Sequence, residues 1–188
     1  MARPAAAVDG RGMTSLVVYE SMFGSSKAVA EAVATALEPA GPVRLVEVGA
    51  LAAEPGGMTV PPDVSLLVVG GPTHAFSMTR PSTRQDAVRE FGSAISADYG
   101  VREWLEAASL PPGLACAAFD TKVLKPNLPG SAGKGIDKGL RKLGGRPVVR
   151  ARTFTVHGKA GGLVEGQLEA ATAWGTELCG LAGQPATV

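Results

Sequence analysis

The sequence predicts a single α/β domain in which a five-stranded parallel sheet lies between two layers of helices, a three-layer sandwich. Short apolar runs alternate with segments of helical periodicity along almost the whole chain, which is the pattern of repeated βα units. The 188 residues are enough for one complete core and few for two domains. With 45% hydrophobic and 19% charged residues, the composition is that of a globular protein.

The elements follow from the local patterns. Strands are predicted over residues 15–19, 43–48, 64–69, 114–119 and 147–156, the last of them uninterrupted. Helices are predicted from Ser25 or Ser26 to about residue 37, over 81–91, 101–108 and 134–143, and after Gly161-Gly162. Gly70-Gly71-Pro72 ends the third strand, and residues 120–133 form a long loop. We expect the domain to span residues 14–183, between a disordered leader over 1–13 and a loose tail over 184–188.

Composition argues against several classes of protein. The net charge is +1 and no block of Lys or Arg stands out, so nothing indicates nucleic-acid binding. No run of about 18 apolar residues predicts a membrane span, and the first residues lack the apolar stretch of a signal peptide. Cys116 and Cys179 lie in apolar segments and are predicted to be free thiols, which fits a cytoplasmic protein. Because His74 and His157 have no second ligand at metal-binding spacing, no metal site is expected.

The loop after the first predicted strand has the composition of an anion site. In an open parallel sheet, ligands bind beyond the carboxyl ends of the strands. In this sequence the end of the first predicted strand is followed, just before a helix, by Ser21, Met22, Phe23, Gly24, Ser25 and Ser26. A phosphate needs unpaired backbone N–H groups, the positive end of a helix dipole and hydroxyl donors, and Gly24 lets the backbone come close. The alternative is a plain helix cap, and Lys27 either adds charge or points to solvent.

The segment 17–33, Val-Val-Tyr-Glu-Ser-Met-Phe-Gly-Ser-Ser-Lys-Ala-Val-Ala-Glu-Ala-Val, resembles the flavodoxin signature. One fixed position differs, because Ser26 stands where the family usually has threonine, and it keeps the hydroxyl group. The resemblance implies a flavodoxin-like fold with strand order 2-1-3-4-5 and a bound flavin mononucleotide (FMN). It places the FMN phosphate against residues 21–26.

The loop after the third strand, residues 70–78, resembles the Gly-x-Pro-Thr-aromatic loop of flavodoxin-like quinone reductases. The resemblance implies that the flavin ring contacts Pro72, Thr73, His74, Ala75 and Phe76. His74 stands where the family often has tyrosine. It is a weak candidate for a catalytic proton donor, and the alternatives are an edge contact or a hydrogen bond that stabilises the loop.

After the fourth strand, the resemblance implies that Asp120, Thr121 and Lys122 meet the pyrimidine end of the flavin. Flavodoxins that carry electrons usually place acidic residues and a stacking aromatic here, whereas this chain has Lys122 and Lys125. Cations near this edge favour a two-electron-reduced, anionic flavin. The alternative is that both lysines are solvated loop charges.

Three functions therefore remain open. The favoured one is an FMN-dependent oxidoreductase that takes hydride from NADH or NADPH and reduces a small acceptor such as a quinone. The second is a one-electron flavodoxin that docks on redox partner proteins, although 18 basic against 17 acidic residues show no acidic docking face. The third is a binding or regulatory protein without FMN. Residues 79–110 are longer than a simple crossover and either cover the flavin, form a contact in a homo-oligomer or make a surface helical pair.

Overall fold

The computed structural model describes residues 13–123 and 129–182 of the chain. The predicted tail over 184–188, Lys125 and all but the last residue of the predicted leader lie outside the described residues.

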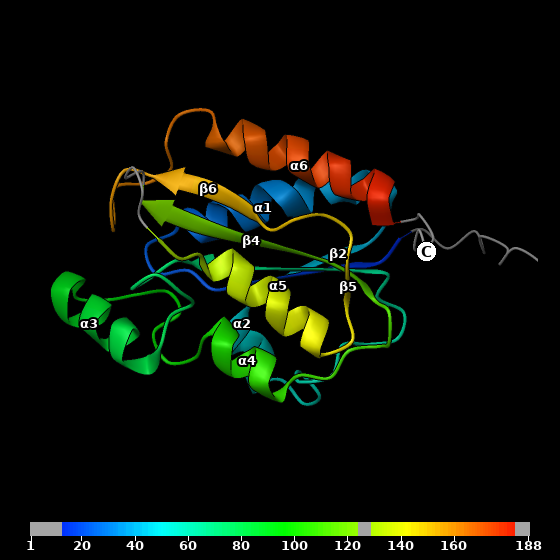
Figure 1. Cartoon of the computed structure of the whole chain (residues 1–188), viewed down its shortest axis with the longest axis horizontal. Coiled ribbons are helices and arrows are strands. Elements are labelled where there is room, and N and C mark those ends of the chain that lie inside the picture. Colours follow the sequence, from blue (N-terminus) through cyan, green and yellow to red (C-terminus); the bar gives the residue numbers. More distant parts are fainter. Residues whose placement is uncertain (1–12, 124–128, 183–188) are drawn as a thin grey trace, which may run out of the picture.

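A parallel sheet forms the centre of the molecule (Figure 1). Its strands are β1 (Ser15–Tyr19), β2 (Val43–Glu47), β3 (Leu66–Pro72), β4 (Ala115–Val123), β5 (Arg146–Pro147) and β6 (Arg152–Val156). They are arranged in the order β2-β1-β3-β4-β5, and β6 also pairs with β4. The predicted α/β class and the strand order 2-1-3-4-5 are confirmed, with β5 and β6 sharing the fifth position.

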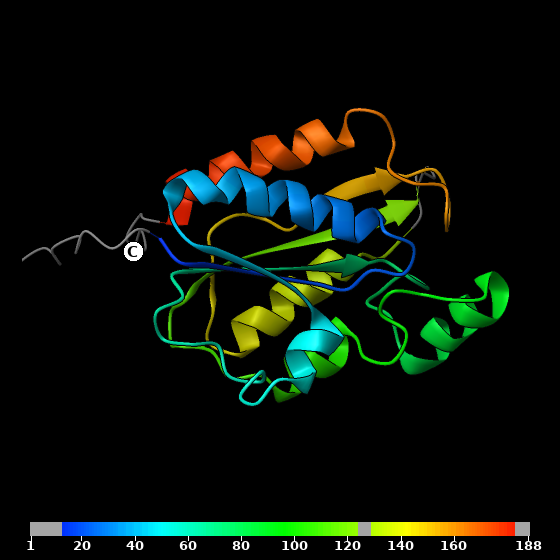
Figure 2. The same ribbon diagram turned by 180° about the vertical axis from the view of Figure 1, so that it is seen from behind.

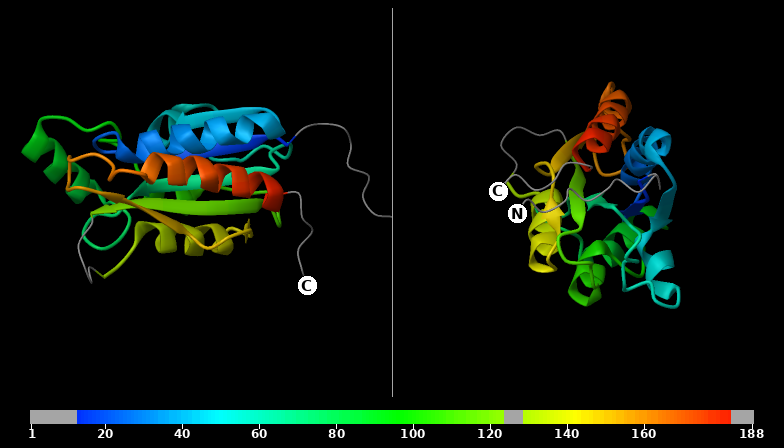
Figure 3. Two further views of the ribbon diagram at one scale, coloured as in Figure 1. Left: turned by 90° about the horizontal axis from the view of Figure 1, so that it is seen from above. Right: turned by 90° about the vertical axis from the view of Figure 1, so that its right-hand side faces the viewer.

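Helices cover both faces of the sheet, as Figures 1 and 2 show. One face carries α1 (Ser25–Leu37) and α6 (Gln167–Ala182), and the other carries α2 (Val48–Ala53), α4 (Val101–Ala107) and α5 (Ala132–Lys142). A short 3-10 turn, η1 (Glu38–Ala40), follows α1. The remaining helix, α3 (Pro81–Phe91), belongs to neither layer and stands beyond the carboxyl ends of the strands (Figure 3).

The apolar patterns of the sequence become two cores, one on each face of the sheet. All residues of β1 and β3 are buried, because a parallel sheet is covered on both sides. Val29, Val33 and Leu37, spaced four residues apart in α1, are fully buried. Gly175 lets α6 approach α1 closely, since a Cβ there would lie 3.0 Å from the carbonyl oxygen of Val33. Both cysteines are free.

The third and fourth strands are longer than predicted. β3 continues through Gly70. A Cβ at that position would overlap the ring of Phe119 on β4, so this glycine permits close packing within the sheet and does not make a turn. The polar residues Asp120, Thr121 and Lys122 were predicted in a loop and lie in β4. Their strand pairs with Gly71 and Pro72 of β3, and the pairing extends further because Thr73 N–H donates to the Thr121 carbonyl.

Other boundaries also differ from the predictions. The fifth strand is interrupted and was predicted to be continuous. Ala115 of β4 pairs with Arg146 and Phe119 of β4 pairs with Arg152, so the edge strand has two more residues than β4 between these pairs. The short helix α2 was not predicted, and it begins where the Glu47 carboxylate accepts from the Ala50 N–H. α5 begins two residues earlier than predicted.

Candidate functional site

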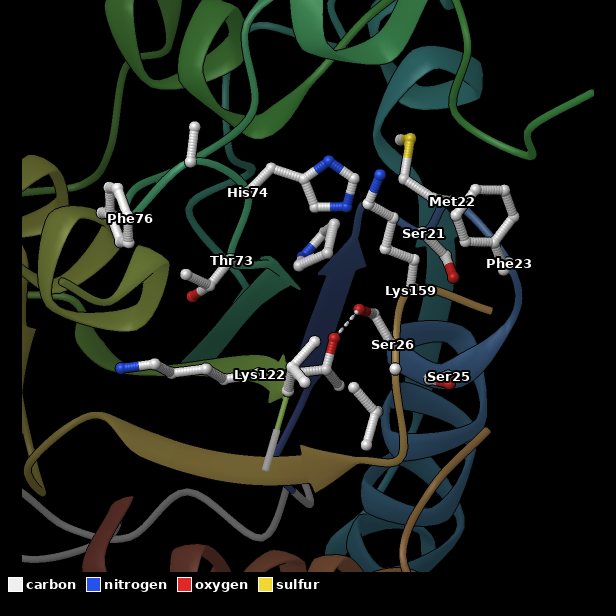
Figure 4. Close-up of a pocket in the computed structure, with 16 residues that line it drawn as sticks. Ser21, Met22, Phe23, Ser25, Ser26, Thr73, His74, Phe76, Lys122 and Lys159 are labelled. Atoms are coloured by element: carbon white, nitrogen blue, oxygen red, sulfur yellow. Dashed lines mark hydrogen bonds between the residues drawn. The ribbon is translucent and has the colours of Figure 1, made fainter. Parts of the chain in front are cut away.

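A cavity of about 270 Å³ opens at the carboxyl ends of β1, β3, β4 and β6 (Figure 4). It brings together every predicted cofactor-binding residue except Gly24 and Asp120. The predicted residues that line it are Ser21, Met22, Phe23, Ser25, Ser26, Pro72, Thr73, His74, Ala75, Phe76, Thr121 and Lys122. Val123, Val156, Gly158 and Lys159 line it as well. These four were missed because no motif marks the ends of β4 and β6.

The loop between β1 and α1 forms one end of the cavity. Gly24 caps α1 in the left-handed region, with φ of 98°, where glycine is favoured. The prediction that Ser25 or Ser26 caps the helix is wrong. The buried Ser21 Oγ instead accepts from the N–H groups of Gly24, at 3.1 Å, and Lys27, at 3.3 Å. Ser26 Oγ lies 2.7 Å from Thr121 Oγ1 and joins the first turn of α1 to β4.

Two lysine side chains reach the cavity, and Lys27 is not one of them. Lys27 is 45% exposed and its Nζ lies 3.7 Å from the Glu31 carboxylate, one helical turn on, so the solvent-facing alternative holds. Lys122 and Lys159 line the cavity from different elements (Figure 4). Lys122 Nζ donates to the Gly130 carbonyl at 2.8 Å, and Lys159 Nζ donates to Glu90 at 2.6 Å.

A tight turn after β3 forms the rim of the cavity. His74 and Ser77 exchange two backbone hydrogen bonds, of 2.9 and 3.0 Å, around Ala75 and Phe76. These two residues have φ of 44° and 69°, a left-handed backbone that costs non-glycine residues about 1 kcal/mol or more each. The turn holds Phe76 at the edge of the cavity with its side chain 54% exposed. Gly130 packs directly beneath, since a Cβ there would overlap the Phe76 carbonyl.

The His74 imidazole points from this turn toward the side of the cavity that holds Ser21 and Lys159 (Figure 4). Burial lowers the pKa of His74, and the nearby Lys159 charge lowers it further. The imidazole is therefore neutral near pH 7, with one N–H donor and one acceptor nitrogen.

Asp120 lies behind the cavity and does not line it. Its side chain is fully buried, and Oδ2 accepts from Thr73 Oγ1 at 2.7 Å, Ser131 Oγ at 2.7 Å and Gly133 N–H at 3.0 Å. Its other oxygen accepts from Thr153 Oγ1 at 2.6 Å. The carboxylate thus ties the β3 loop, α5 and β6 together and supports the wall of the cavity from behind.

The segment before α4 is hydrogen-bonded to the loop between β1 and α1. Ser96 N–H donates to the Ser21 carbonyl at 2.8 Å, and Ser21 N–H donates to Ser96 Oγ at 3.0 Å. Next to this pair, Ile95 N–H donates to the Met22 carbonyl at 3.0 Å. Sequence reasoning missed these contacts because they join residues about 75 positions apart. The long insert therefore holds the loop that begins α1.

A buried ionic network lies at the base of the same loop. Glu20, 1% exposed, accepts from Thr79 Oγ1 and from Val101 N–H, the latter at 2.8 Å. Arg84, also buried, donates to Thr79 Oγ1 at 2.9 Å and to Glu103 at 3.1 Å. Burial raises the pKa of the Glu20 carboxyl to about 7, against the opposing effect of the two hydrogen bonds and the Arg84 charge, and the Glu103 charge raises it further.

Metal and membrane sites are not indicated in the described parts of the chain. Within residues 13–123 and 129–182, no group of three or more His, Cys, Asp or Glu side chains is placed to hold a metal ion. No helix in these ranges combines the length and apolar character needed to cross a membrane.

Comparisons with known proteins support the fold. No family model and no curated protein matches the sequence. Among solved structures, an archaeal flavodoxin has 18% identity and a TM-score of 0.57, with 92% of this chain and 100% of that chain covered. A short-chain flavodoxin associated with a bacterial microcompartment has 16% identity and a TM-score of 0.62, covering 91% and 99%. A WrbA-like flavodoxin from Agrobacterium tumefaciens has 16% identity and a TM-score of 0.53, covering 90% and 97%. The resemblance seen in the sequence is thereby confirmed at the level of the fold, and the chain has a flavodoxin-like α/β fold.

Proposed function

We propose that the protein binds FMN in the 270 Å³ cavity and passes electrons from a nicotinamide donor to a small acceptor such as a quinone. One observation carries the proposal: the three loops that the sequence singled out converge on one cavity at the carboxyl edge of the sheet. Bound FMN would supply the redox chemistry, and the protein would supply binding, orientation and electrostatics.

The phosphate end of the cavity fits an anion. The first turn of α1 offers backbone N–H groups that no helical carbonyl accepts. Gly24 and Lys27 donate to Ser21, so Ser25 and Ser26 supply the N–H groups left for an anion among the described residues. Ser25 and Ser26 also bring hydroxyl groups to this end, and Ser26 Oγ is bonded to Thr121 as well. Nothing lies within 4 Å of the position that a Cβ on Gly24 would take, so the left-handed backbone, and not crowding, favours glycine there.

The other end of the cavity fits a flat ring system. Pro72 and the turn through Phe76 form one wall, and Val123 and Val156 add apolar surface at the ends of β4 and β6. A volume of about 270 Å³ is slightly below the roughly 300–1,000 Å³ of most ligand pockets. An apolar slot joined to a polar anion end has the two-part character of FMN, so the residues present fit the cofactor.

The residues at the ring end support two-electron chemistry. Lys122 and Lys159 are among the lining residues, and positive charge near the cavity favours negative charge on a bound ligand, although Glu90 offsets part of the Lys159 charge. His74, being neutral, can donate one hydrogen bond to a ligand and can pass on a proton taken from water. Its role as a catalytic residue stays a prediction.

One feature favours the second candidate, an electron carrier that docks on proteins. Three exposed apolar residues lie near the site: Phe76, Phe91 and Ile95, which are 54%, 41% and 48% exposed. Exposed apolar residues near a redox site are suited to transient contact with a partner protein. This candidate predicts the same FMN site and differs in the number of electrons moved per step.

Titration of the full chain with FMN tests the cofactor, with flavin fluorescence and the visible spectrum as readouts. Gly24→Val should weaken FMN binding at least tenfold, because valine resists a φ of 98° and reshapes the loop. Gly113→Val is the matched control: Gly113 has φ of 75°, equally open surroundings and no place in the cavity. It should cost comparable stability and leave FMN binding intact.

Equal FMN affinity for both variants would contradict the placement of the phosphate. If the unchanged protein does not bind FMN, the proposal is refuted and the candidate that stands is a binding or regulatory protein without FMN. If FMN binds, anaerobic addition of NADH or NADPH separates the remaining candidates. Direct bleaching of the flavin spectrum supports the oxidoreductase. Reduction that proceeds only electrochemically, in two separate one-electron steps, supports the carrier.

A further inference from the structure

A second cavity, of about 170 Å³, lies between α3 and the main cavity. The two cavities share Phe23, His74, Ala75 and Lys159. The rest of the second cavity comes from α3, which stands beyond the strand ends in Figures 1 and 3. A molecule in this cavity would therefore lie directly beside a ligand in the main one.

Three separate contacts hold α3 in this position. The Phe91 ring packs on Phe23, with centroids 4.6 Å apart. The Glu90 carboxylate pairs with Lys159 Nζ at 2.6 Å. Arg84 is buried in the ionic network with Glu103. Two of these contacts are to residues that line the main cavity, so the helix is positioned by the site itself and the space beneath it is a formed cavity.

The lining of the cavity defines the kind of ligand that fits. Phe23, Phe91 and Ala87 provide aromatic and apolar walls, which suit a flat ring. A cavity of about 150 Å³ is known to hold a benzene molecule, so one six-membered ring with small substituents fills this one. His74 and Lys159 offer hydrogen-bond donors on the side that faces the main cavity.

The charges on α3 exclude another class of ligand. Two carboxylates, of Asp86 and Glu90, lie on the helix side of the cavity, and each is paired, Asp86 with Arg89 and Glu90 with Lys159. The one lysine in the lining is therefore already engaged by a carboxylate. A dinucleotide carries two phosphates, and the residues that line this cavity offer them no cation that is not already paired with a carboxylate. The cavity therefore suits an uncharged compound better than a nicotinamide dinucleotide.

We propose that the cavity under α3 binds an uncharged, single-ring aromatic or quinoid compound whose carbonyl oxygen accepts a hydrogen bond from Lys159 or His74. The inference rests on the proposed function in one respect, which is that such a compound would be the electron acceptor. It narrows the acceptor to one ring and assigns its contacts to α3, a helix outside the layers of the sandwich.

Binding of 4-hydroxyacetophenone, a redox-inert compound with one ring and one carbonyl, tests the proposal. The full chain is used with and without saturating FMN, and the readouts are calorimetry and the NMR shifts of the His74 imidazole. Ala87→Leu fills the cavity from α3 and should lower the affinity for the probe at least tenfold, while the affinity for FMN stays within twofold. Gln85→Leu, on the exposed face of the same helix, should bind the probe like the unchanged protein.

Phe91→Ala is a second variant, for use if Ala87→Leu disturbs the helix. It removes one wall of the cavity and should also lower the affinity for the probe. Undiminished binding to both variants, competition between the probe and FMN, or no probe binding to a protein that binds FMN would overturn the inference and leave the proposed function intact. A protein that binds the probe and not FMN would refute the proposed function and retain the cavity as a ligand site.

Discussion

Replacing Glu20 with glutamine should change how the stability of this protein depends on pH. Glu20 is buried at the end of β1, where it accepts from Thr79 and Val101. The charged groups that face it are Arg84 from α3 and Glu103 from α4. Burial is the largest effect and raises the pKa of Glu20 from 4.5 to about 7.

The sign follows from the proton balance. A carboxyl group whose pKa is higher in the folded state binds its proton more tightly there than in the unfolded chain. Its contribution to stability is therefore fully present below pH 4.5 and is lost as the pH rises to about 7. At about 1.4 kcal/mol per pKa unit, the loss across this window is about 3 kcal/mol. Above pH 7 it changes no further.

Urea denaturation between pH 4 and pH 8.5 measures the effect. Glutamine retains an acceptor for the Val101 N–H and has no charge to desolvate, so Glu20→Gln should gain about 3 kcal/mol relative to the unchanged protein between about pH 4.5 and pH 8. Glu31→Gln, which removes a half-exposed carboxylate, is the control and should show no such gain. Parallel pH profiles for the unchanged protein and Glu20→Gln would refute the reasoning.

Two further predictions concern Phe76, at the rim of the main cavity, and Asp120, which supports the cavity from behind. Asp120→Ala should destabilise the protein by about 3 kcal/mol or more, because it removes the acceptor of three donors on different elements, one of them the buried Gly133 N–H. Thermal denaturation measures this, with the exposed Asp63→Ala as control, and a cost below about 1 kcal/mol would contradict the supporting role. Phe76→Gly should raise stability by about 1 kcal/mol by relieving the left-handed backbone, and should weaken FMN binding. Phe91→Gly, in the regular helix α3, should lower stability instead, and a loss of stability in both variants would argue against strain at Phe76.

Much of the fold could be predicted because its signals are local. The alternation of apolar runs and helical spacing marked β1 and α3 to the residue, as well as the buried face of α1. The prediction failed where polar residues lie inside a strand. Thr121 and Asp120 resembled a loop because their hydrogen-bond partners, such as Ser26 and Thr153, are distant in sequence.

The candidate site shows the same division. Its loops could be found because serines and a glycine at a helix start, or glycine and proline after a strand, have a meaning of their own for an anion or a ring. Lys159 and Ser96 could not be found, since each is an ordinary residue until folding brings it beside Glu90 or Ser21.

The sequence by itself therefore determined the α/β class, the strand order that the resemblance implied, and the loops that line the main cavity. Only the tertiary structure decided that Asp120 supports the cavity from behind, that Ser21 turns its hydroxyl into its own loop, and that α3 lines a second cavity. The physical reason is range. Propensity, periodicity and turn chemistry act over a few residues, whereas burial, charge pairing and cavity shape depend on segments that meet only when the chain folds.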